Sequence, residues 1–372
     1  MSDRINNNHI SINQIDREVY VKRLQVDYYG GYGITDQVYS YGIDNLYPDK
    51  CKATAQRSNS LTTAIKTFSR FVSGGGFTNY GNGFVNSDDM TANELLSFIA
   101  SEHAEIGIAI HVKYNVFGEI AELVPLRFEQ VRKGIQGNLF IRASWDLREI
   151  HKFGIGQQTP IEVLPFNPQN AINEIKEVGF ENYTGQLIYF HNSLNEVYPL
   201  ARYDAVLDDA QFEADAKIYS LSNMHNEFSM SGVFKYPKAL ESTDEGQELI
   251  KKLNTKGKGE VNKGRFIAMG LPPSAMEKNL NVWESFTHPN SDTMYLNSRE
   301  DAKKNIYEIY QQPSIINGRT DSGMFNAQSM QDAFDFYNSV TESDRKQIES
   351  LFNYIYPVLA PFEIIPLTFI KK

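Results

Sequence analysis

Residues 204–221 read DAVLDDAQFEADAKIYSL, the most helical stretch of the chain. Apolar residues recur along it at intervals of three or four, which places them on one face of an α-helix. These apolar residues are Leu207, Ala210, Ala214, Ile218 and Leu221. The opposite faces carry acidic residues, namely Asp204, Asp208, Asp209, Glu213 and Asp215. The pattern predicts an amphipathic helix over about 200–228 with a solvated acidic face.

The segment after this helix has a different character. Residues 231–290 predict a small α/β insert, with a short helix over 244–253 and a strand over 265–269. Between residues 250 and 265 basic side chains outnumber acids, of which Glu260 is the one example. The basic residues are Lys251, Lys252, Lys256, Lys258, Lys263 and Arg265. Because such side chains can contact a partner or a phosphate backbone without reading bases, we expect this cluster to face partners.

A second helix is predicted over 292–311, where Ala302, Ile306 and Ile309 share one side. Polar, turn-forming sequence follows from 313 to 325. Beyond this loop, an apolar stripe predicts one further long helix that reaches about residue 355. Prolines near the end of the chain favour an extended C-terminal segment.

The N-terminal half changes from helical to strand periodicity. Helical spacing ends at Gly74-Gly75-Gly76, and Thr91 with Glu94 forms a capping-box pattern at the start of the next helix. Period-two alternation and short apolar runs then predict strands over 108–114, 120–126, 139–143, 161–164 and 187–191. Residues 50–195 are therefore expected to form an α+β unit with a mostly antiparallel sheet, preceded by a polar arm over 1–25.

Composition excludes several classes of protein. The 372 residues carry a net charge of −10, which excludes tight, nonspecific DNA binding by the whole surface. One cysteine, Cys51, excludes an internal disulfide framework and a multi-thiolate metal site. Apolar runs fall far short of the ~18 residues that a membrane-spanning helix needs. The polar first ten residues predict no secretory signal.

No catalytic signature is present in the sequence. The seven histidines form no zinc-protease motif, and Gly259–Gly264 is followed by Arg265 and Phe266 rather than by the Lys-Ser/Thr pair of a phosphate loop. We therefore predict no catalytic residues, no metal site and no cofactor. A metal-dependent nuclease built from scattered carboxylates remains an alternative, because sequence alone does not show whether three or four carboxylates converge.

Several short motifs occur in a characteristic order. They are YGIDNLYP at 41–48, a strand–turn–strand segment at 107–126, LIYFH at 187–191 with Tyr198-Pro199-Leu200, a Gly/Asn segment at 257–269, the helix end at 307–313, and Asp321-Ser322-Gly323. In this order, and with the two long helices that flank a basic insert, the chain resembles the portal proteins of tailed bacteriophages. The resemblance covers about residues 40–355. The residues Ile316-Asn317-Gly318 depart from the usual sequence of the family at this position.

The resemblance implies an α+β portal-like fold. An N-terminal arm and α/β wing would span 1–199, and two stem helices would span 200–230 and 291–312. A small α/β clip would occupy 231–290, and a tunnel loop would occupy 313–325. A long wing helix and an extended C-terminal segment would follow over 326–372, with a minimal or absent crown.

The resemblance also implies a function. The family forms homo-oligomeric rings, usually of twelve subunits, at a unique capsid vertex of the virion, after assembly in the host cytoplasm. Double-stranded DNA would pass through the channel without sequence specificity during packaging and ejection. The implied partners are the major capsid protein, the head–tail adaptor and the terminase large subunit, with no membrane. Another ring-forming virion protein, such as an adaptor, remains an alternative.

Three groups of residues receive roles from this resemblance. The acidic stem residues would repel DNA phosphates and prevent sticking, since like charges oppose the contacts that slow sliding. The basic clip residues would bind the motor and the adaptor. The tunnel-loop residues would form the narrowest part of the channel; they are Asn317, Gly318, Arg319, Thr320, Asp321, Ser322 and Gly323.

Overall fold

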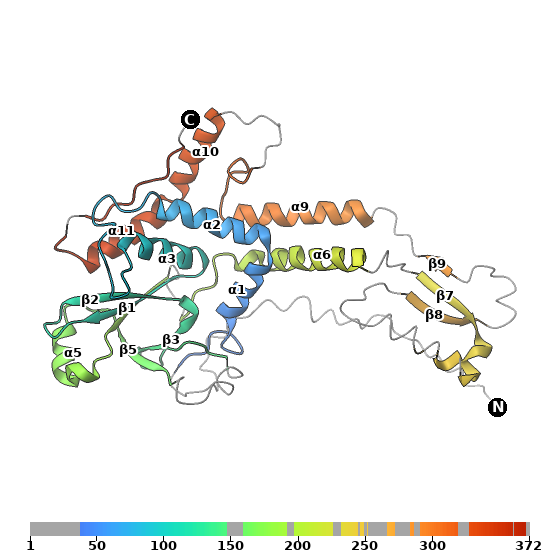
Figure 1. Ribbon diagram of the computed structural model, residues 1–372, viewed down its shortest axis with the longest axis horizontal. Helices are drawn as coiled ribbons and strands as arrows, with labels where there is room; N and C mark the ends of the chain where they lie inside the picture. The colour runs from blue at the N-terminus through green and yellow to red at the C-terminus, as the bar shows by residue number, and fades with distance from the viewer. Residues whose placement is uncertain are drawn as a thin grey trace, which may run out of the picture. The chain divides into compact units, whose positions relative to one another are not determined.

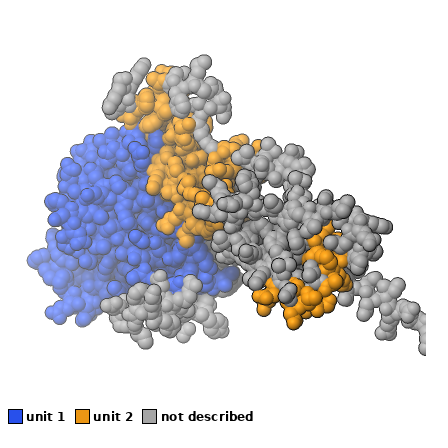
Figure 2. Space-filling model, turned by 45° about the vertical axis from the view of Figure 1, so that its right-hand side comes forward, with its two compact units in different colours: residues 1–52, 69–202, 341–367 blue, residues 53–68, 203–340, 368–372 orange. Residues whose placement is uncertain are grey.

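The computed structural model describes most of the chain in two compact units (Figures 1 and 2). The described residues are 38–146, 159–191, 197–225, 232–244, 246–248, 251, 266–271, 283–285, 291–318, 327–359 and 361–369. Unit 1 comprises Met1–Lys52, Ser69–Arg202 and Thr341–Leu367, and unit 2 comprises Ala53–Phe68, Tyr203–Val340 and Thr368–Lys372. The expected arm over residues 1–25 lies outside the described residues.

Unit 1 contains a six-stranded sheet with the strand order β2-β1-β6-β5-β4-β3. Its strands are β1 (Ile108–Tyr114), β2 (Ile120–Leu126), β3 (Val131–Lys133), β4 (Leu139–Ile141), β5 (Ile161–Pro165) and β6 (Gln186–Phe190). Neighbouring strands are antiparallel except β5 and β6, which are parallel. The structure therefore confirms the mixed α and β architecture and the mostly antiparallel sheet.

The β1–β2 hairpin shows how local sequence sets this sheet. Ile110 and Val112 are fully buried, as the alternation predicted. The side chain of Asn115 accepts hydrogen bonds from the backbone N–H groups of Phe117 (2.9 Å) and Glu119 (3.0 Å). An asparagine that satisfies turn N–H groups in this way fixes the reversal of the chain.

Helices and short 3-10 turns complete unit 1. They are α1 (Tyr47–Arg57), α2 (Asn59–Ser73), α3 (Ala92–Glu105), η2 (Phe128–Gln130), α5 (Ala171–Val178), η4 (Phe180–Asn182) and α11 (Glu342–Ile355). The later part of α1 and the start of α2 belong to unit 2. The capping box at α3 is confirmed: Thr91 Oγ1 accepts from Glu94 N, and Glu94 Oε2 accepts from Thr91 N. Cys51 is buried in α1.

The glycine triplet after α2 places the C-terminal segment. Gly74 has a φ of +56°, and a Cβ atom there would lie 2.1 Å from the carbonyl oxygen of Ile365. Gly75 N donates to Ile365 O (2.7 Å) and Ile365 N donates to Gly76 O (2.9 Å). Glycine at position 74 tolerates the positive φ that ends α2, and its lack of a Cβ atom leaves room for the C-terminal segment.

Unit 2 contains α6, α9, α10 and a three-stranded sheet. Its elements are η5 (Asp204–Val206), α6 (Leu207–His225), β7 (Gly232–Pro237), η6 (Lys238–Ser242), β8 (Phe266–Leu271), β9 (Trp283–Ser285), α9 (Ser291–Ile309) and α10 (Ala327–Val340). The predicted strand at 265–269 corresponds to β8. In contrast, the sequence prediction missed β7, because Ser231-Gly232 and Pro237 signalled only a break. Pro237 has no backbone N–H to donate and stands at the last position of β7, where the pairing with β8 ends.

One expectation for the C-terminal part is wrong. The sequence predicted a single long helix after residue 326, whereas the structure has α10 and α11 with Thr341 between them. Thr341 is buried, with φ −89° and ψ 0°, and its hydroxyl accepts a 2.7 Å hydrogen bond from Arg345. Arg345 also donates to Phe71 O (3.1 Å), so the start of α11 is tied to the end of α2. None of the helices in the described ranges is long and apolar enough to cross a membrane.

Candidate functional site

The two predicted stem helices form a pair in unit 2. Helices α6 and α9 contact each other along their length and run side by side (Figure 1). Ala210 and Ala214 of α6 and Ala302 and Ile306 of α9 are buried. Three of these four buried residues are alanines, whose small side chains allow close packing.

Glu213 does not lie on a solvated face, contrary to the sequence prediction. Its side chain is buried and accepts hydrogen bonds from the Ser58 hydroxyl, from Ser60 N (3.1 Å) and from the Ser60 hydroxyl (2.9 Å). Backbone N–H groups at the start of a helix are unsatisfied within the helix, so a carboxylate there is a favourable partner. Glu213 therefore fastens the start of α2 to α6.

The other four acidic residues have different environments. Asp208 is exposed, and Asp204 in η5 is partly buried. Asp209 accepts a 3.2 Å hydrogen bond from Asn305 of α9, and burial raises the pKa of its carboxyl. Asp215 forms a 3.5 Å ion pair with Arg57. Since Asp208 and Asp215 are seven positions apart on one helix, they share a face.

The apolar stripe of α6 is only partly covered. Ala210 and Ala214 are buried, but Ile218 and Leu221 near the end of α6 are 46% and 47% exposed. Two large apolar side chains therefore continue the buried stripe into solvent.

The described part of the predicted tunnel loop is a series of tight turns. Gln312 donates a 2.6 Å hydrogen bond from its side chain to Ala64 O, which holds the exit of α9 against α2. Successive bonds follow from Ile316 N to Pro313 O and from Gly318 N to Ile315 O, both 3.1 Å. Gly318 has a φ of +73°. The rest of the loop lies outside the described residues, namely Arg319, Thr320, Asp321, Ser322 and Gly323.

The predicted clip cluster is described at one position. Lys251 is exposed. The other basic residues lie outside the described ranges, namely Lys252, Lys256, Lys258, Lys263 and Arg265.

Two motifs far apart in the sequence meet in unit 1. The ring of Tyr41 stacks on Tyr198, with centroids 4.2 Å apart, and on Tyr47, with centroids 5.3 Å apart. The hydroxyl of Tyr41 donates to Pro199 O, and the hydroxyl of Tyr47 accepts from Ala201 N (3.0 Å). The YGIDNLYP segment therefore packs on the segment that leads toward α6.

Arg132 fixes the turn inside this motif. It donates to Asn45 Oδ1 and Asn45 O, both at 2.6 Å. Its guanidinium lies 5.4 Å from the centroid of the Tyr41 ring and 5.1 Å from that of Trp145. A buried guanidinium group requires several such hydrogen bonds and ring contacts, because an unpaired buried charge is strongly destabilising.

Two further ionic groups of unit 1 were not predicted. Asp344 on α11 contacts His103 Nε2 (2.7 Å) and Arg202 Nη2 (2.6 Å). Hydrogen bonds to these partners lower the pKa of Asp344 although its burial opposes this shift. The second group surrounds Lys52 and contains Glu102, Glu105 and Glu129. The residues of each group are distant from one another in the sequence, so no spacing pattern could predict that they meet.

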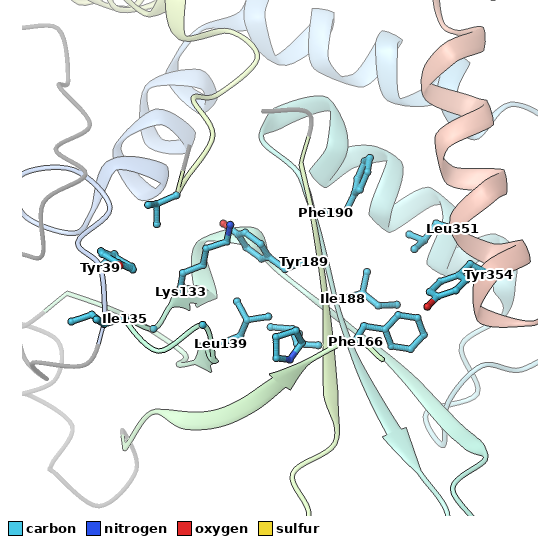
Figure 3. A pocket seen from close by; sticks show the side chains of 15 residues that line it. Tyr39, Lys133, Ile135, Leu139, Phe166, Ile188, Tyr189, Phe190, Leu351 and Tyr354 are labelled. Atoms are coloured by element: carbon cyan, nitrogen blue, oxygen red, sulfur yellow. The ribbon is translucent and has the colours of Figure 1, made fainter. Parts of the chain in front are cut away.

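An open hollow of about 750 Å³ lies in unit 1 and was also not predicted (Figure 3). Its lining comes mainly from β6 and from the segment 133–139 between β3 and β4, with further residues from α11, and includes Leu139, Phe166, Ile188 and Tyr354. Phe166 and Tyr354 meet edge to face at 5.5 Å. Among the described residues of the lining, the charged side chain is that of Lys133, and burial lowers its pKa. The lining residues are suited to holding apolar side chains.

Within the described ranges, no group of three or more His, Cys, Asp or Glu side chains is arranged to hold a metal ion. No protein-family model matches the chain, and no curated protein matches it in sequence.

Solved structures do resemble it in fold. A chain of the virion of a native gene transfer agent particle superposes with a TM-score of 0.51 at 15% identity, over 86% of this chain and 83% of the other. A chain from the neck of the native particle, computed with C12 symmetry, gives a TM-score of 0.50 at 14% identity, over 86% and 83%. A chain from the neck of the empty particle, computed with C6 symmetry, gives a TM-score of 0.50 at 15% identity, over 86% of this chain and 84% of the other. The protein therefore shares its fold with chains of virion and neck assemblies.

Proposed function

We propose that this chain is a portal subunit, a virion protein that forms a closed ring at one capsid vertex and provides the channel for genome packaging and ejection. The observation that carries the proposal is the shared fold over 86% of the chain with chains of neck assemblies that have C12 and C6 symmetry. The order of the motifs, with α6 and α9 on either side of a basic insert, supports the same assignment. Twelve subunits is the expected number.

The uncovered end of the α6 stripe supports a ring. Ile218 and Leu221 continue the buried side of α6 into solvent. In a ring, each subunit presents one surface to the next and a different surface to the previous one, and such a heterologous contact closes if the rotation does. We expect Ile218 and Leu221 to contact the neighbouring copy.

The acidic face of α6 suits a DNA channel. Asp208 is exposed on this face, Asp215 shares the face but pairs with Arg57, and Glu213 is buried and therefore does not contribute. Repeated around a ring, such carboxylates repel phosphate groups and leave DNA free to slide. The basic clip residues would dock the terminase motor during packaging and the head–tail adaptor afterwards, and the loop after α9 would narrow the channel. A passive conduit of this kind needs no catalytic group.

The ring is tested by native mass spectrometry and electron microscopy of the purified full chain. The double variant Ile218→Asp with Leu221→Asp should shift the particle from a ring to monomers, because two charges would be buried at the contact. The control is Ile172→Asp on α5, an apolar residue of similar exposure (41%) outside the helix pair, which should leave the ring intact. Monomeric wild-type protein at micromolar concentration would refute the proposal.

A portal is separated from a ring-forming adaptor by its partners. A portal ring binds the terminase large subunit and supports packaging of DNA into capsids, whereas an adaptor binds an already filled head. Pull-down of the terminase large subunit by the purified ring, with a packaging assay, decides between them. Binding only to filled heads would favour the adaptor.

A further inference from the structure

Three carboxylates surround one buried ammonium group in unit 1. Lys52 Nζ lies 2.8 Å from Glu102 Oε1, 2.6 Å from Glu129 Oε2 and 3.7 Å from Glu105 Oε2. The side chains of Lys52, Glu102, Glu105 and Glu129 are 13%, 10%, 19% and 13% exposed. We call these four residues the Lys52 cluster. It joins α1, α3 and η2.

The charges in and beside the cluster do not balance. Asp49 of α1 lies close enough to interact with Lys52, Glu129 and Arg132, and burial raises the pKa of its carboxyl. The four carboxylates of Asp49, Glu102, Glu105 and Glu129 against the two cations Lys52 and Arg132 would give a net charge of −2 if all were ionised. An uncompensated buried charge is costly, and a carboxyl group avoids the cost by taking up a proton.

The distances to Lys52 distinguish Glu105 from the other two glutamates of the cluster. Glu102 accepts two bonds from Lys52 (2.8 and 3.0 Å) and one from the backbone N–H of Phe128 (2.8 Å). Glu129 has the shortest contact with Lys52. Glu105 has the longest, and it is the last residue of α3, where the negative end of the helix dipole disfavours a carboxylate.

We propose that the Lys52 cluster holds a proton on Glu105 in the folded protein at neutral pH, and that alkaline pH removes this proton and weakens the junction of α1, α3 and η2. Burial raises the pKa of Glu105 to about 7, Lys52 opposes this shift, and Glu102 and Glu129 add to it. The same three glutamates raise the pKa of Lys52 although burial lowers it, so the ammonium stays charged.

The position of Glu105 connects this proton to the path of the chain. The carbonyl oxygen of Glu105 accepts a 2.8 Å hydrogen bond from the backbone N–H of Arg202. The side chain of Arg202 in turn contacts Asp344 of α11. Tyr203, the next residue, is the first of this segment that belongs to unit 2. The pH-sensitive junction thus lies where the chain leaves unit 1 toward α6.

The sign of the pH effect follows from linkage. A carboxyl whose pKa is higher in the folded state than in the unfolded state stabilises the fold when protonated, and this contribution is lost as pH rises from the unfolded to the folded pKa. With a folded pKa of about 7, the unfolding constant of the wild-type chain should rise about tenfold between pH 6 and pH 8 from this group.

The test compares urea unfolding of the full chain with that of Glu105→Gln at fixed protein concentration from pH 6 to pH 9. The ratio of the wild-type to the variant unfolding constant should rise about tenfold between pH 6 and pH 8. The control Glu177→Gln makes the same chemical change at an exposed position of α5 and should show a constant ratio. A constant ratio for Glu105→Gln as well would overturn the proposal.

A second measurement does not depend on the variant's folding. The infrared absorption of a protonated carboxyl group in wild-type protein should disappear as pH rises through about 7. Glu129→Gln removes a neighbouring negative charge and should lower the pH of this loss, whereas Lys52→Met removes the cation and should raise it. Opposite shifts in the pH of this loss distinguish a protonated Glu105 from a merely structural role of the cluster. Absence of a protonated carboxyl at pH 6, or shifts of the same sign, would refute the assignment.

Discussion

Glu213 in unit 2 and Glu105 in unit 1 are both withdrawn from solvent, yet their surroundings differ. Glu213 is held by three neutral donors from two serines at the start of α2. Glu105 lies among other carboxylates, 3.7 Å from the one ammonium group that they share. Glu213 therefore holds α2 to α6 through hydrogen bonds, whereas we propose that Glu105 binds a proton.

The largest expected effect comes from removing the shared cation. Lys52→Met leaves Glu102, Glu105 and Glu129 without their counter-charge and should lower the free energy of unfolding by about 3 kcal/mol or more. The loss should be larger at pH 8 than at pH 6, where Glu105 is protonated. Urea unfolding at the two pH values measures it. Lys113→Met, which removes a lysine that is 51% exposed from a surface ion pair, should cost less than about 0.5 kcal/mol.

Removing the hydrogen-bonded carboxylate of Glu213 should lower the free energy of unfolding by a smaller amount. Glu213→Ala leaves Ser58 and Ser60 without their acceptor and should lower the free energy of unfolding by about 2 kcal/mol. Asp208→Ala, an exposed acid on the same helix, is the control and should change it by no more than about 0.5 kcal/mol. Equal losses for the two variants would show that Glu213 is not a fastening.

Removing one donor from the same site should have a smaller effect. Ser60→Ala deletes the 2.9 Å bond to Glu213 but keeps the bond from the backbone N–H of residue 60, so a loss of about 1 kcal/mol is expected. A double-mutant cycle with Glu213→Ala checks the coupling, because neighbours in one hydrogen-bond network are not additive. Strict additivity would contradict a shared site.

The smallest expected effect lies at the exposed capping box, where Thr91 pairs with the carboxylate of Glu94. Thr91→Ala removes the side-chain half of the capping box at α3 and should lower the free energy of unfolding by about 1 kcal/mol or less. Thr91→Ser keeps the hydroxyl and should retain most of the stability. Thermal unfolding of both variants measures the difference. A larger loss than for Glu213→Ala would reverse the ranking of buried and exposed sites.

The sequence predicted the elements that depend on local patterns. The strands at 108–114 and 120–126 occur with those bounds, because period-two alternation and the turn at Asn115 act within a few residues. The Thr91 capping box and the end of α2 before Gly74 were predicted for the same reason. The break at Thr341 was missed, since the apolar stripe continues through it and Arg345 stabilises it by a tertiary contact.

The candidate site was predicted less completely. The acidic and apolar positions of α6 were identified, but the burial of Glu213 depends on serines about 150 positions earlier in the chain. The Lys52 cluster likewise joins residues from three elements, and no spacing rule connects them. Similarly, the segments 41–48 and 198–200 were noted separately, and only the fold shows that Tyr41 stacks on Tyr198.

The packing of Trp145 beside Arg132 provides an optical reporter. The chain has two tryptophans, Trp145 in unit 1 and Trp283 in β9 of unit 2, so each unit carries one natural fluorophore. Trp145 is 2% exposed and donates from its indole nitrogen to Gln130 O (3.1 Å), beside η2 and the Lys52 cluster. In a Trp283→Phe background, its emission therefore reports the opening of unit 1 alone, and in a Trp145→Phe background the remaining signal belongs to unit 2.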